Sequence, residues 1–158
     1  MIALGSWLMA DGSWEKIETR SWLMAHSSYK KGRVMNEMKF SFEDLEVWQK
    51  AIEFAYKVIQ LTQKIDTDRK HYRLIENCEA AASSIACNIA EGKGRYSKKE
   101  FIQFLYIARG SLYESITQLI IFHKNKWINE KDLQEMKVLG SEIGKMISSL
   151  INSIRKTI

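Results

Sequence analysis

The sequence contains no proline, although average usage of roughly 5% would place about eight in a chain of 158 residues. Proline lacks a backbone N–H and clashes with the preceding helical turn, so helix interiors exclude it. A β-sandwich or a turn-rich α/β fold normally contains some proline. The absence therefore favours a chain that is almost entirely helical.

Cysteines and long apolar runs are also scarce. The two cysteines, Cys78 and Cys87, are nine residues apart, which in a helix is a rise of about 13.5 Å. That places them on opposite faces, too far apart for a disulfide. We expect two reduced, buried thiols and a cytoplasmic location. No apolar run approaches the roughly 18 residues of a membrane span, and the first residues lack the positive segment of a secretory signal.

The composition changes near residue 37. In residues 1–36 glycine and serine interrupt every helical pattern, and SWLMA occurs twice, at residues 6–10 and 21–25. Two copies are too few for a solenoid. We predict an irregular or disordered leader in residues 1–36, with a peptide that docks its tryptophans on a partner as the alternative.

Residues 37–158 carry the pattern of four helices, at about 42–63, 69–91, 97–124 and 129–156. In each, apolar or small residues recur at spacings of three and four, which indicates one buried face. Short loops make sequential helices antiparallel neighbours. The predicted fold class is all-α: an antiparallel up-down-up-down four-helix bundle with an irregular N-terminal extension. The predicted buried face of the first helix comprises Leu45, Trp48, Ile52, Ala55 and Ile59.

The helix ends have recognisable signals. Ser97 and Glu100 form the pattern of a capping box, and Asn129 is a favourable N-cap for the fourth helix. Gly92 and Gly94 are predicted to end the second helix in a left-handed conformation.

The third helix is more apolar than one core requires. Its predicted core face is flanked by further apolar side chains, among them Tyr106, Ile107 and Tyr113. A run of small residues at 80–84 would allow close approach of another helix. These features favour a homo-oligomer, because a monomer rarely exposes so large an apolar stripe. The alternative is that a single core covers all of these residues.

Motifs for metal, nucleotide or catalytic chemistry are missing. The sequence has no HExxH, GxxxxGK[ST] or GxGxxG motif and no paired-cysteine spacing. Arg20 and His26 have the spacing used by some all-helical ribonucleases, but they lie in the leader. Glu76 and Glu79 have no nucleophile or histidine placed near them, so we expect them to be solvated or paired with Arg73. We therefore expect no enzyme activity, no cofactor and no metal.

Basic residues are the most informative feature. Four cations fall within the seven residues 93–99, at the corner before the third helix, and two more lie at its other end. A phosphate backbone would be attracted by their charge and by the amides at the helix start. The alternative is a solvated corner that keeps the protein soluble. The predicted phosphate contacts are Lys93, Arg95, Lys98, Lys99, Lys124 and Lys126.

Two segments, FEDLEVWQKA at residues 42–51 and a longer one at residues 80–114, resemble the bacterial four-helix bundle proteins encoded in 23S rRNA intervening sequences. The resemblance covers about residues 40–156. The motif residues that carry it are Asn88, Glu91, Gly92, Ser97, Arg109 and Glu114.

The resemblance implies an up-down four-helix bundle, commonly a homopentamer with a basic surface and no known catalytic site. It also implies a relation to the accessory variability proteins of diversity-generating retroelements, which bind nucleic acid and a reverse transcriptase. The chain departs from the family where paired arginines often stand, because Cys78 and Glu79 occupy that place. We expect packing roles for Asn88 and Glu91, and pairing of Arg109 with Glu114 across helices or subunits.

The sequence therefore predicts a non-enzymatic, oligomeric four-helix bundle that binds structured RNA or DNA through a basic surface. It would act as an accessory factor linked to rRNA intervening sequences or retroelements. The alternative is a protein-interaction scaffold without nucleic-acid binding.

Overall fold

A computed structural model describes residues 7–10, 13–16, 38–67 and 70–158 of the chain. Its contacts divide the chain into two units, Met1–Met38 and Lys39–Ile158. In the first unit, β1 (Trp7–Ala10) pairs with β2 (Ser13–Lys16) in an antiparallel hairpin, in which Trp7 lies opposite Lys16 and Ala10 opposite Ser13.

The two strands are a difference from the predicted irregular leader. The dipeptide Asp-Gly at residues 11–12 separates them, and Asp-Gly is favoured in two-residue hairpin connections, so the sequence carried a signal for this hairpin. The second SWLMA copy, at residues 21–25, lies outside the described residues, as do Arg20 and His26.

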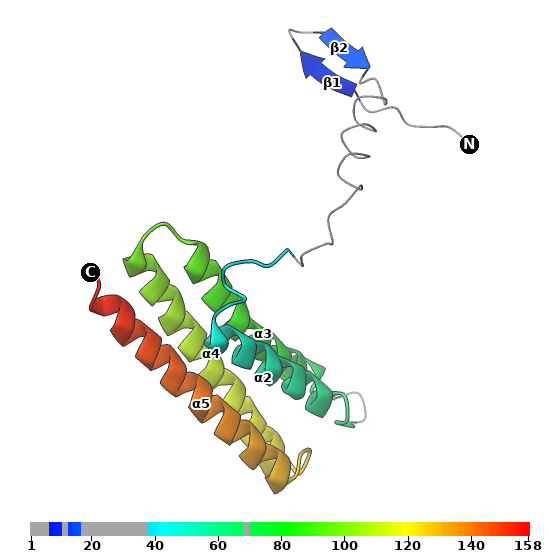
Figure 1. Ribbon diagram of the computed structural model, residues 1–158. Helices are drawn as coiled ribbons and strands as arrows, with labels where there is room; N and C mark the ends of the chain where they lie inside the picture. The colour runs from blue at the N-terminus through cyan, green and yellow to red at the C-terminus, as the bar shows by residue number, and fades with distance from the viewer. Residues whose placement is uncertain (1–6, 11–12, 17–37, 68–69) are drawn as a thin grey trace, which may run out of the picture. The chain divides into compact units, whose positions relative to one another are not determined.

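The second unit consists of four helices: α2 (Glu46–Thr62), α3 (Tyr72–Gly94), α4 (Lys98–Lys124) and α5 (Glu130–Arg155). Each helix packs against the next one along the chain, and α5 closes the bundle against α2 (Figure 1). The predicted all-α bundle with up-down-up-down order is confirmed. No helix in the described part of the chain is long and apolar enough to cross a membrane.

One hydrophobic core runs between the four helices. Its largest fully buried side chains include Phe54 of α2, Ile85 of α3, Phe122 of α4 and Ile143 of α5. In α3, α4 and α5, apolar or small residues spaced three and four apart pack inward, as the sequence pattern predicts, and some toward the helix ends, such as Phe101 and Ile154, are half-buried.

The face predicted for α2 is wrong. Of its five predicted core residues only Ala55 is buried, and Ile52 is 44% exposed. The helix has apolar residues around most of its circumference, so two faces satisfy the spacing of three and four. The observed face buries an aromatic ring, which removes a large apolar area from water. The buried residues of α2 are Val47, Ala51, Phe54, Ala55, Val58 and Thr62.

The predicted caps of α4 and α5 are confirmed. The Ser97 hydroxyl accepts a hydrogen bond from the Glu100 backbone N–H, and the Ser97 N–H donates to the Glu100 carboxylate, each at 3.2 Å. The Asn129 side chain accepts from the Asp132 backbone N–H at 2.8 Å. Each cap satisfies backbone donors that a helix start leaves without an intrahelical partner.

Gly92 and Gly94 do not act as the predicted left-handed stop. The helix α3 continues through both and ends at an extended Arg95, and neither glycine has a positive φ. A Cβ atom on Gly92 would lie 2.6 Å from Phe104 Cβ and 2.8 Å from Phe101 Cδ2, whereas one on Gly94 would meet nothing within 4 Å. Glycine at 92 therefore serves close approach of α3 and α4.

The two thiols lie on opposite sides of α3, as predicted, but only one is buried. Cys78 is fully enclosed, with its sulfur 3.9 Å from the Ser115 carbonyl oxygen, and Cys87 is exposed. Burial raises the pKa of the Cys78 thiol to about 12. The expectation of two buried thiols is therefore wrong for Cys87.

Candidate nucleic-acid interface

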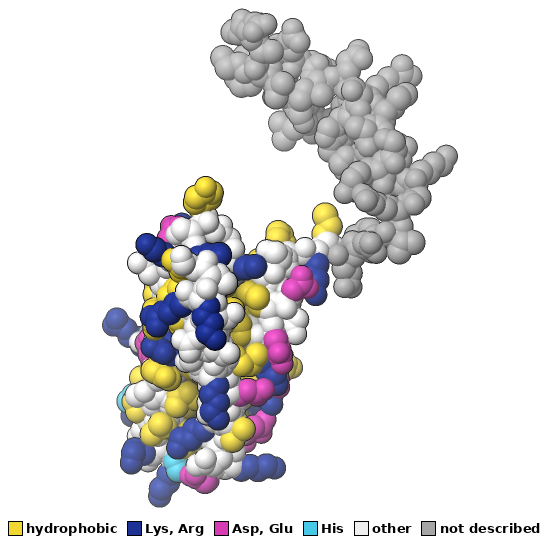
Figure 2. All heavy atoms as spheres, turned by 60° about the vertical axis from the view of Figure 1, so that its left-hand side comes forward, with side chains coloured by type: hydrophobic (Ala, Val, Ile, Leu, Met, Phe, Trp, Pro, Cys, Tyr) yellow, Lys and Arg dark blue, Asp and Glu magenta, His cyan; other side chains and the backbone are white. Residues whose placement is uncertain are grey.

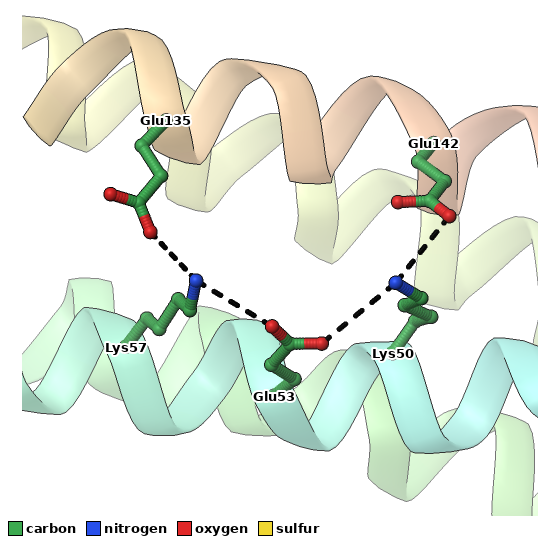
Figure 3. A network of polar contacts seen from close by, with 5 residues as sticks. All are labelled: Lys50, Glu53, Lys57, Glu135 and Glu142. Atoms are coloured by element: carbon green, nitrogen blue, oxygen red, sulfur yellow. Dashed lines mark hydrogen bonds and ion pairs between the residues drawn. The ribbon is translucent and has the colours of Figure 1, made fainter. Parts of the chain in front are cut away.

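Lysines and carboxylates form a network where α2 meets α5 (Figure 3). Lys57 Nζ lies 2.6 Å from a Glu135 oxygen and 3.5 Å from a Glu53 oxygen. Lys50 Nζ lies 3.5 Å from Glu142 and 3.9 Å from Glu53. The hydrogen bond with Glu135 raises the pKa of Lys57, and the same bond lowers the pKa of Glu135. The two α2 lysines are thus matched by carboxylates.

The other side of α5 carries cations without such partners. A groove of about 680 Å³ runs between α4 and α5, and Lys137 and Lys145 line it. No Asp or Glu is among its lining residues. Within the described residues neither lysine makes an ion pair. An anion that enters this groove would meet two ammonium groups and no carboxylate among the lining residues.

Two arginines gather around one tyrosine near the C-terminal end of α5. Arg155 Nη2 donates to the Tyr106 hydroxyl at 2.6 Å. The Arg109 guanidinium lies 4.9 Å, and that of Arg155 5.8 Å, from the centre of the same ring. These are cation–π contacts, and they leave most of the guanidinium N–H donors available. Lys98 adds a third cation at this end, since its ammonium donates to the Thr157 carbonyl at 3.0 Å.

These cations define a surface that we call the α4–α5 basic face. Figure 2 turns forward the side of the bundle where α5 lies in Figure 1, and Lys and Arg side chains are spread along its whole length. Most of the visible Asp and Glu side chains lie along one edge. Such a distribution suits phosphate contacts, which position a nucleic acid without reading its sequence. The face comprises Lys98, Arg109, Lys137, Lys145 and Arg155.

The residues predicted as phosphate contacts fall into two groups. Lys93, Lys98 and Lys99 are exposed at the corner between α3 and α4, and Lys124 and Lys126 are exposed at the far end of α4. The 27 residues of α4 span about 40 Å. The structure therefore does not bring the two groups together. Of the six predicted contacts, only Lys98 belongs to the α4–α5 basic face.

Arg95 is less available than the other predicted contacts. Its guanidinium pairs with Glu91 and lies 4.7 Å from the centre of the Phe104 ring. Glu91 does not have the expected packing role at the α3–α4 crossing. It is exposed and pairs with Arg95, which lies one turn further along the chain. Arg95 thus serves mainly to cover Phe104.

Of the remaining motif residues, Asn88 takes part in hydrogen bonds that link α3 to α4. The Asn88 amide donates to the Ser84 hydroxyl at 2.9 Å, and the Ser84 hydroxyl lies 3.0 Å from the Ser111 hydroxyl of α4. This chain of hydrogen bonds supports a packing role for Asn88. Glu114 is exposed and makes no ion pair with Arg109 within the described part of the chain.

Sequence reasoning missed Lys137, Lys145 and Arg155. They are scattered over one helix, so no window of the sequence is densely basic. The available signal was a second face on α5, in which Lys137, Ser141, Lys145 and Ser149 recur every four residues beside the apolar stripe.

The expected pairing of Glu79 with Arg73 is also absent. Glu79 instead accepts a hydrogen bond of 2.5 Å from the Thr62 hydroxyl, which ties α3 to the end of α2. Among the residues that the structure describes, no group of three or more His, Cys, Asp or Glu is placed to hold a metal ion.

Comparison with known proteins agrees with this fold. Residues 43–149 match the model of a family described as 23S rRNA-intervening sequence protein. The chain is also similar, at 25% identity and a TM-score of 0.62, to the crystal structure of a protein of unknown function from the S23 ribosomal protein family of Bacteroides thetaiotaomicron. That similarity covers 66% of this chain and 97% of the other. Comparison with curated proteins gives no match.

Proposed function

Because the chain belongs to the 23S rRNA-intervening sequence protein family, we propose that it is a non-enzymatic accessory protein that binds structured nucleic acid. The contact surface is the α4–α5 basic face, and the contacts are made to phosphates. The observation that carries the proposal is the unequal distribution of charge around α5. Glu135 and Glu142 pair with lysines of α2, whereas the groove toward α4 is lined by Lys137 and Lys145 and by no carboxylate. At the start of α5, outside this lining, Glu130 pairs with His123 of α4.

The charge separation matters because it removes repulsion from the binding surface. Glu135 and Glu142 are held by Lys57 and Lys50 on the α2 side. A polyanion that enters the groove therefore meets two lysines and no lining carboxylate, and each phosphate that it places there releases condensed counterions. Binding of this kind has little sequence preference and weakens steeply with salt.

A homo-oligomer is part of the proposal. On α4, Ile107 is 52% exposed and Ile121 is 37% exposed, and association would cover apolar surface of this kind. The resemblance to intervening-sequence proteins favours a pentamer. An oligomer repeats the basic face and raises avidity for one long nucleic acid without any new contact. A cytoplasmic role beside an rRNA transcript or a reverse transcriptase follows from the same resemblance.

The test is binding of fluorescent hairpin RNA and duplex DNA over a salt series. We expect Lys137→Glu with Lys145→Glu to weaken binding about ten-fold or more for every sequence and to reduce the salt slope by about two. The matched control is Lys64→Glu with Lys70→Glu, which changes the net charge equally at exposed lysines outside the face.

Two results would contradict the proposal. Equal loss in both double variants would mean that total charge, not the α4–α5 basic face, controls binding. No binding by the wild type at about 50 mM salt, where phosphate contacts are strong, would favour the alternative of a protein-interaction scaffold. The exposed apolar side chains of α4 are the feature that supports that alternative.

A further inference from the structure

Two glycines of α5 lie in the groove between α4 and α5. A Cβ atom on Gly140 would lie 3.0 Å from Ile116 Cδ1, so this glycine permits close packing of the two helices, whereas Gly144 leaves the groove open. Gly140 and Gly144 line the groove with Leu112 and Ile116 of α4. A Cβ atom on Gly144 would meet only Leu112, at 3.7 Å. The resulting volume of about 680 Å³ is larger than a side chain requires and has room for a flat, polar group.

The rim of the groove offers unused hydrogen-bonding groups beside its two lysines. The side chains of Ser141, Ser149 and Asn152 line it, and in the described chain they have no hydrogen-bond partner. Lys137 and Lys145 are eight residues apart on α5, a rise of about 12 Å. Their ammonium groups can therefore contact different phosphates of one strand.

Tyr113 forms part of the α4 wall and is 60% exposed. Its ring contacts no other ring or cation among the described residues, in contrast to the Tyr106 ring, against which Arg109 and Arg155 lie. A free aromatic face beside a basic groove is the arrangement on which proteins stack the bases of single strands.

We propose that this groove binds an unpaired segment of a nucleic-acid strand. Tyr113 stacks one base, Lys137 and Lys145 bind phosphates, and the serine hydroxyls and the Asn152 amide hydrogen-bond to base edges. The inference rests on the proposed function and deepens it, because the basic face alone would bind duplex and single strand alike. A paired base cannot enter the groove, since its faces are stacked and its Watson–Crick edge is paired within the helix.

The lining argues against an apolar helix as the occupant. Such a helix would bury two ammonium groups and several hydroxyls against side chains that cannot hydrogen-bond, and unpaired buried polar groups are costly. The lining contains two lysines and no Asp or Glu, so its positive charge is complementary to the negative charge of a phosphodiester strand.

The experiment compares three RNAs with equal numbers of phosphates: a perfect duplex, a duplex with a central bulge, and a single strand. At one moderate salt concentration, we expect the wild type to favour the bulged and single-stranded RNAs. Tyr113→Ala should reduce those two affinities by about 5- to 150-fold, the range for loss of one stacked base, and leave duplex binding unchanged. Tyr56→Ala is the control, because Tyr56 is 63% exposed on α2.

A second variant tests the groove itself. Gly144→Leu places a side chain in the groove and should remove the same preference. Ser153→Leu is the control, because it adds the same side chain at an exposed position of α5. Ser153 is eleven residues, or about three turns, from Glu142, so it lies on the face of α5 that is directed away from the groove. This variant should have no effect on RNA binding. Thermal unfolding of each variant confirms that it is folded.

The outcomes are distinct. Equal binding of all three RNAs, or a preference that survives both groove substitutions, overturns the groove proposal and leaves the basic face in place. No binding of any RNA at low salt overturns the proposed function and the groove proposal with it. Self-association and the binding of polyglutamate, a probe for acidic proteins, are measured for the same variant. If Gly144→Leu changes only self-association, the groove binds a second copy of the chain; if it changes only the binding of polyglutamate, the groove binds an acidic protein. Either result means that the inference is wrong.

Discussion

Gly92 of α3 lies so close to Phe104 of α4 that a Cβ atom at residue 92 would come within 2.6 Å of the Phe104 Cβ. Phe101 closes the site from the same helix, with its Cδ2 atom 2.8 Å from that position. The phenylalanine Cβ is fixed to the α4 backbone and cannot rotate away. The space at Gly92 therefore sets the separation of α3 and α4 next to the corner that carries Lys93 and Lys98.

Replacing Gly92 by alanine should destabilise the bundle. We expect a loss of about 1–3 kcal/mol in the free energy of unfolding, as for other overpacked sites, measured by urea denaturation. Gly94→Ala is the matched control, because that position is open and alanine is the better helix former. Equal effects of the two substitutions would mean that close approach of α3 and α4 does not require a glycine.

Ser97→Ala should remove the capping box of α4 at a cost of about 1 kcal/mol at neutral pH. Hydrogen bonds from the Ser97 hydroxyl and N–H lower the pKa of Glu100 below its ordinary value of 4.5. A folded-state pKa below the unfolded one adds stability above the unfolded pKa, and this stability is lost as pH falls through the folded pKa. The difference in the free energy of unfolding between the wild type and Ser97→Ala should therefore become smaller as the pH is lowered.

The capping prediction is checked by chemical denaturation at a series of pH values. Glu100→Gln is the control, since it keeps a hydrogen-bonding side chain at this position but cannot titrate. If the difference in the free energy of unfolding between the wild type and Ser97→Ala stays constant down to strongly acidic pH, the Glu100 carboxylate is excluded as its source.

One thiol should react with a disulfide reagent in the native protein and two after unfolding. The thiolate is the nucleophile, and the buried Cys78 has a pKa of about 12, so it stays protonated and enclosed near pH 8. Cys87 is exposed and should react first. Cys87→Ser should abolish the fast reaction, and a fast phase that remains in this variant would show that Cys78 is accessible.

Lys57→Met should destabilise the bundle only slightly, because Lys57 and its partners are partly exposed and surface ion pairs contribute little. The effect should shrink in high salt, which screens the network. Lys57 also lowers the pKa of Glu135, so its contribution is present at neutral pH and is lost on acidification. Thermal unfolding in low and high salt tests this, and a salt-independent loss would point to packing of the lysine stem instead.

The helices could be predicted from the sequence because their signals are local. The Ser97 capping box and the Asn129 cap involve residues within one turn, and the apolar stripes of α3 and α5 are distinct enough to identify the buried face. The apolar stripe of α2 does not identify the buried face, because Ile52 and Phe54 belong to different faces of this helix and both faces are apolar. The packing of α3 and α5 against α2 decides between them, and no local pattern reports it.

The candidate site was only partly accessible from the sequence. A cluster such as Lys93–Lys99 is visible in a short window, but the groove arises only when α4 and α5 pack side by side. Lys137 and Lys145 are then joined by Tyr113 from another helix. The same holds for Gly92. This position requires glycine because Phe101 and Phe104, nine and twelve residues further along the chain, leave no room for a Cβ atom.

The uneven distribution of charge around α5 makes the groove side of this helix more positive than the side that faces α2. Glu135 and Glu142 lie toward α2, and Lys137 and Lys145 line the groove toward α4. The field of a distant polyanion exerts a torque on such a molecule, so that it turns its cationic side forward before any contact forms. Productive collisions then become a larger share of all collisions, and salt should slow association more strongly than it speeds dissociation.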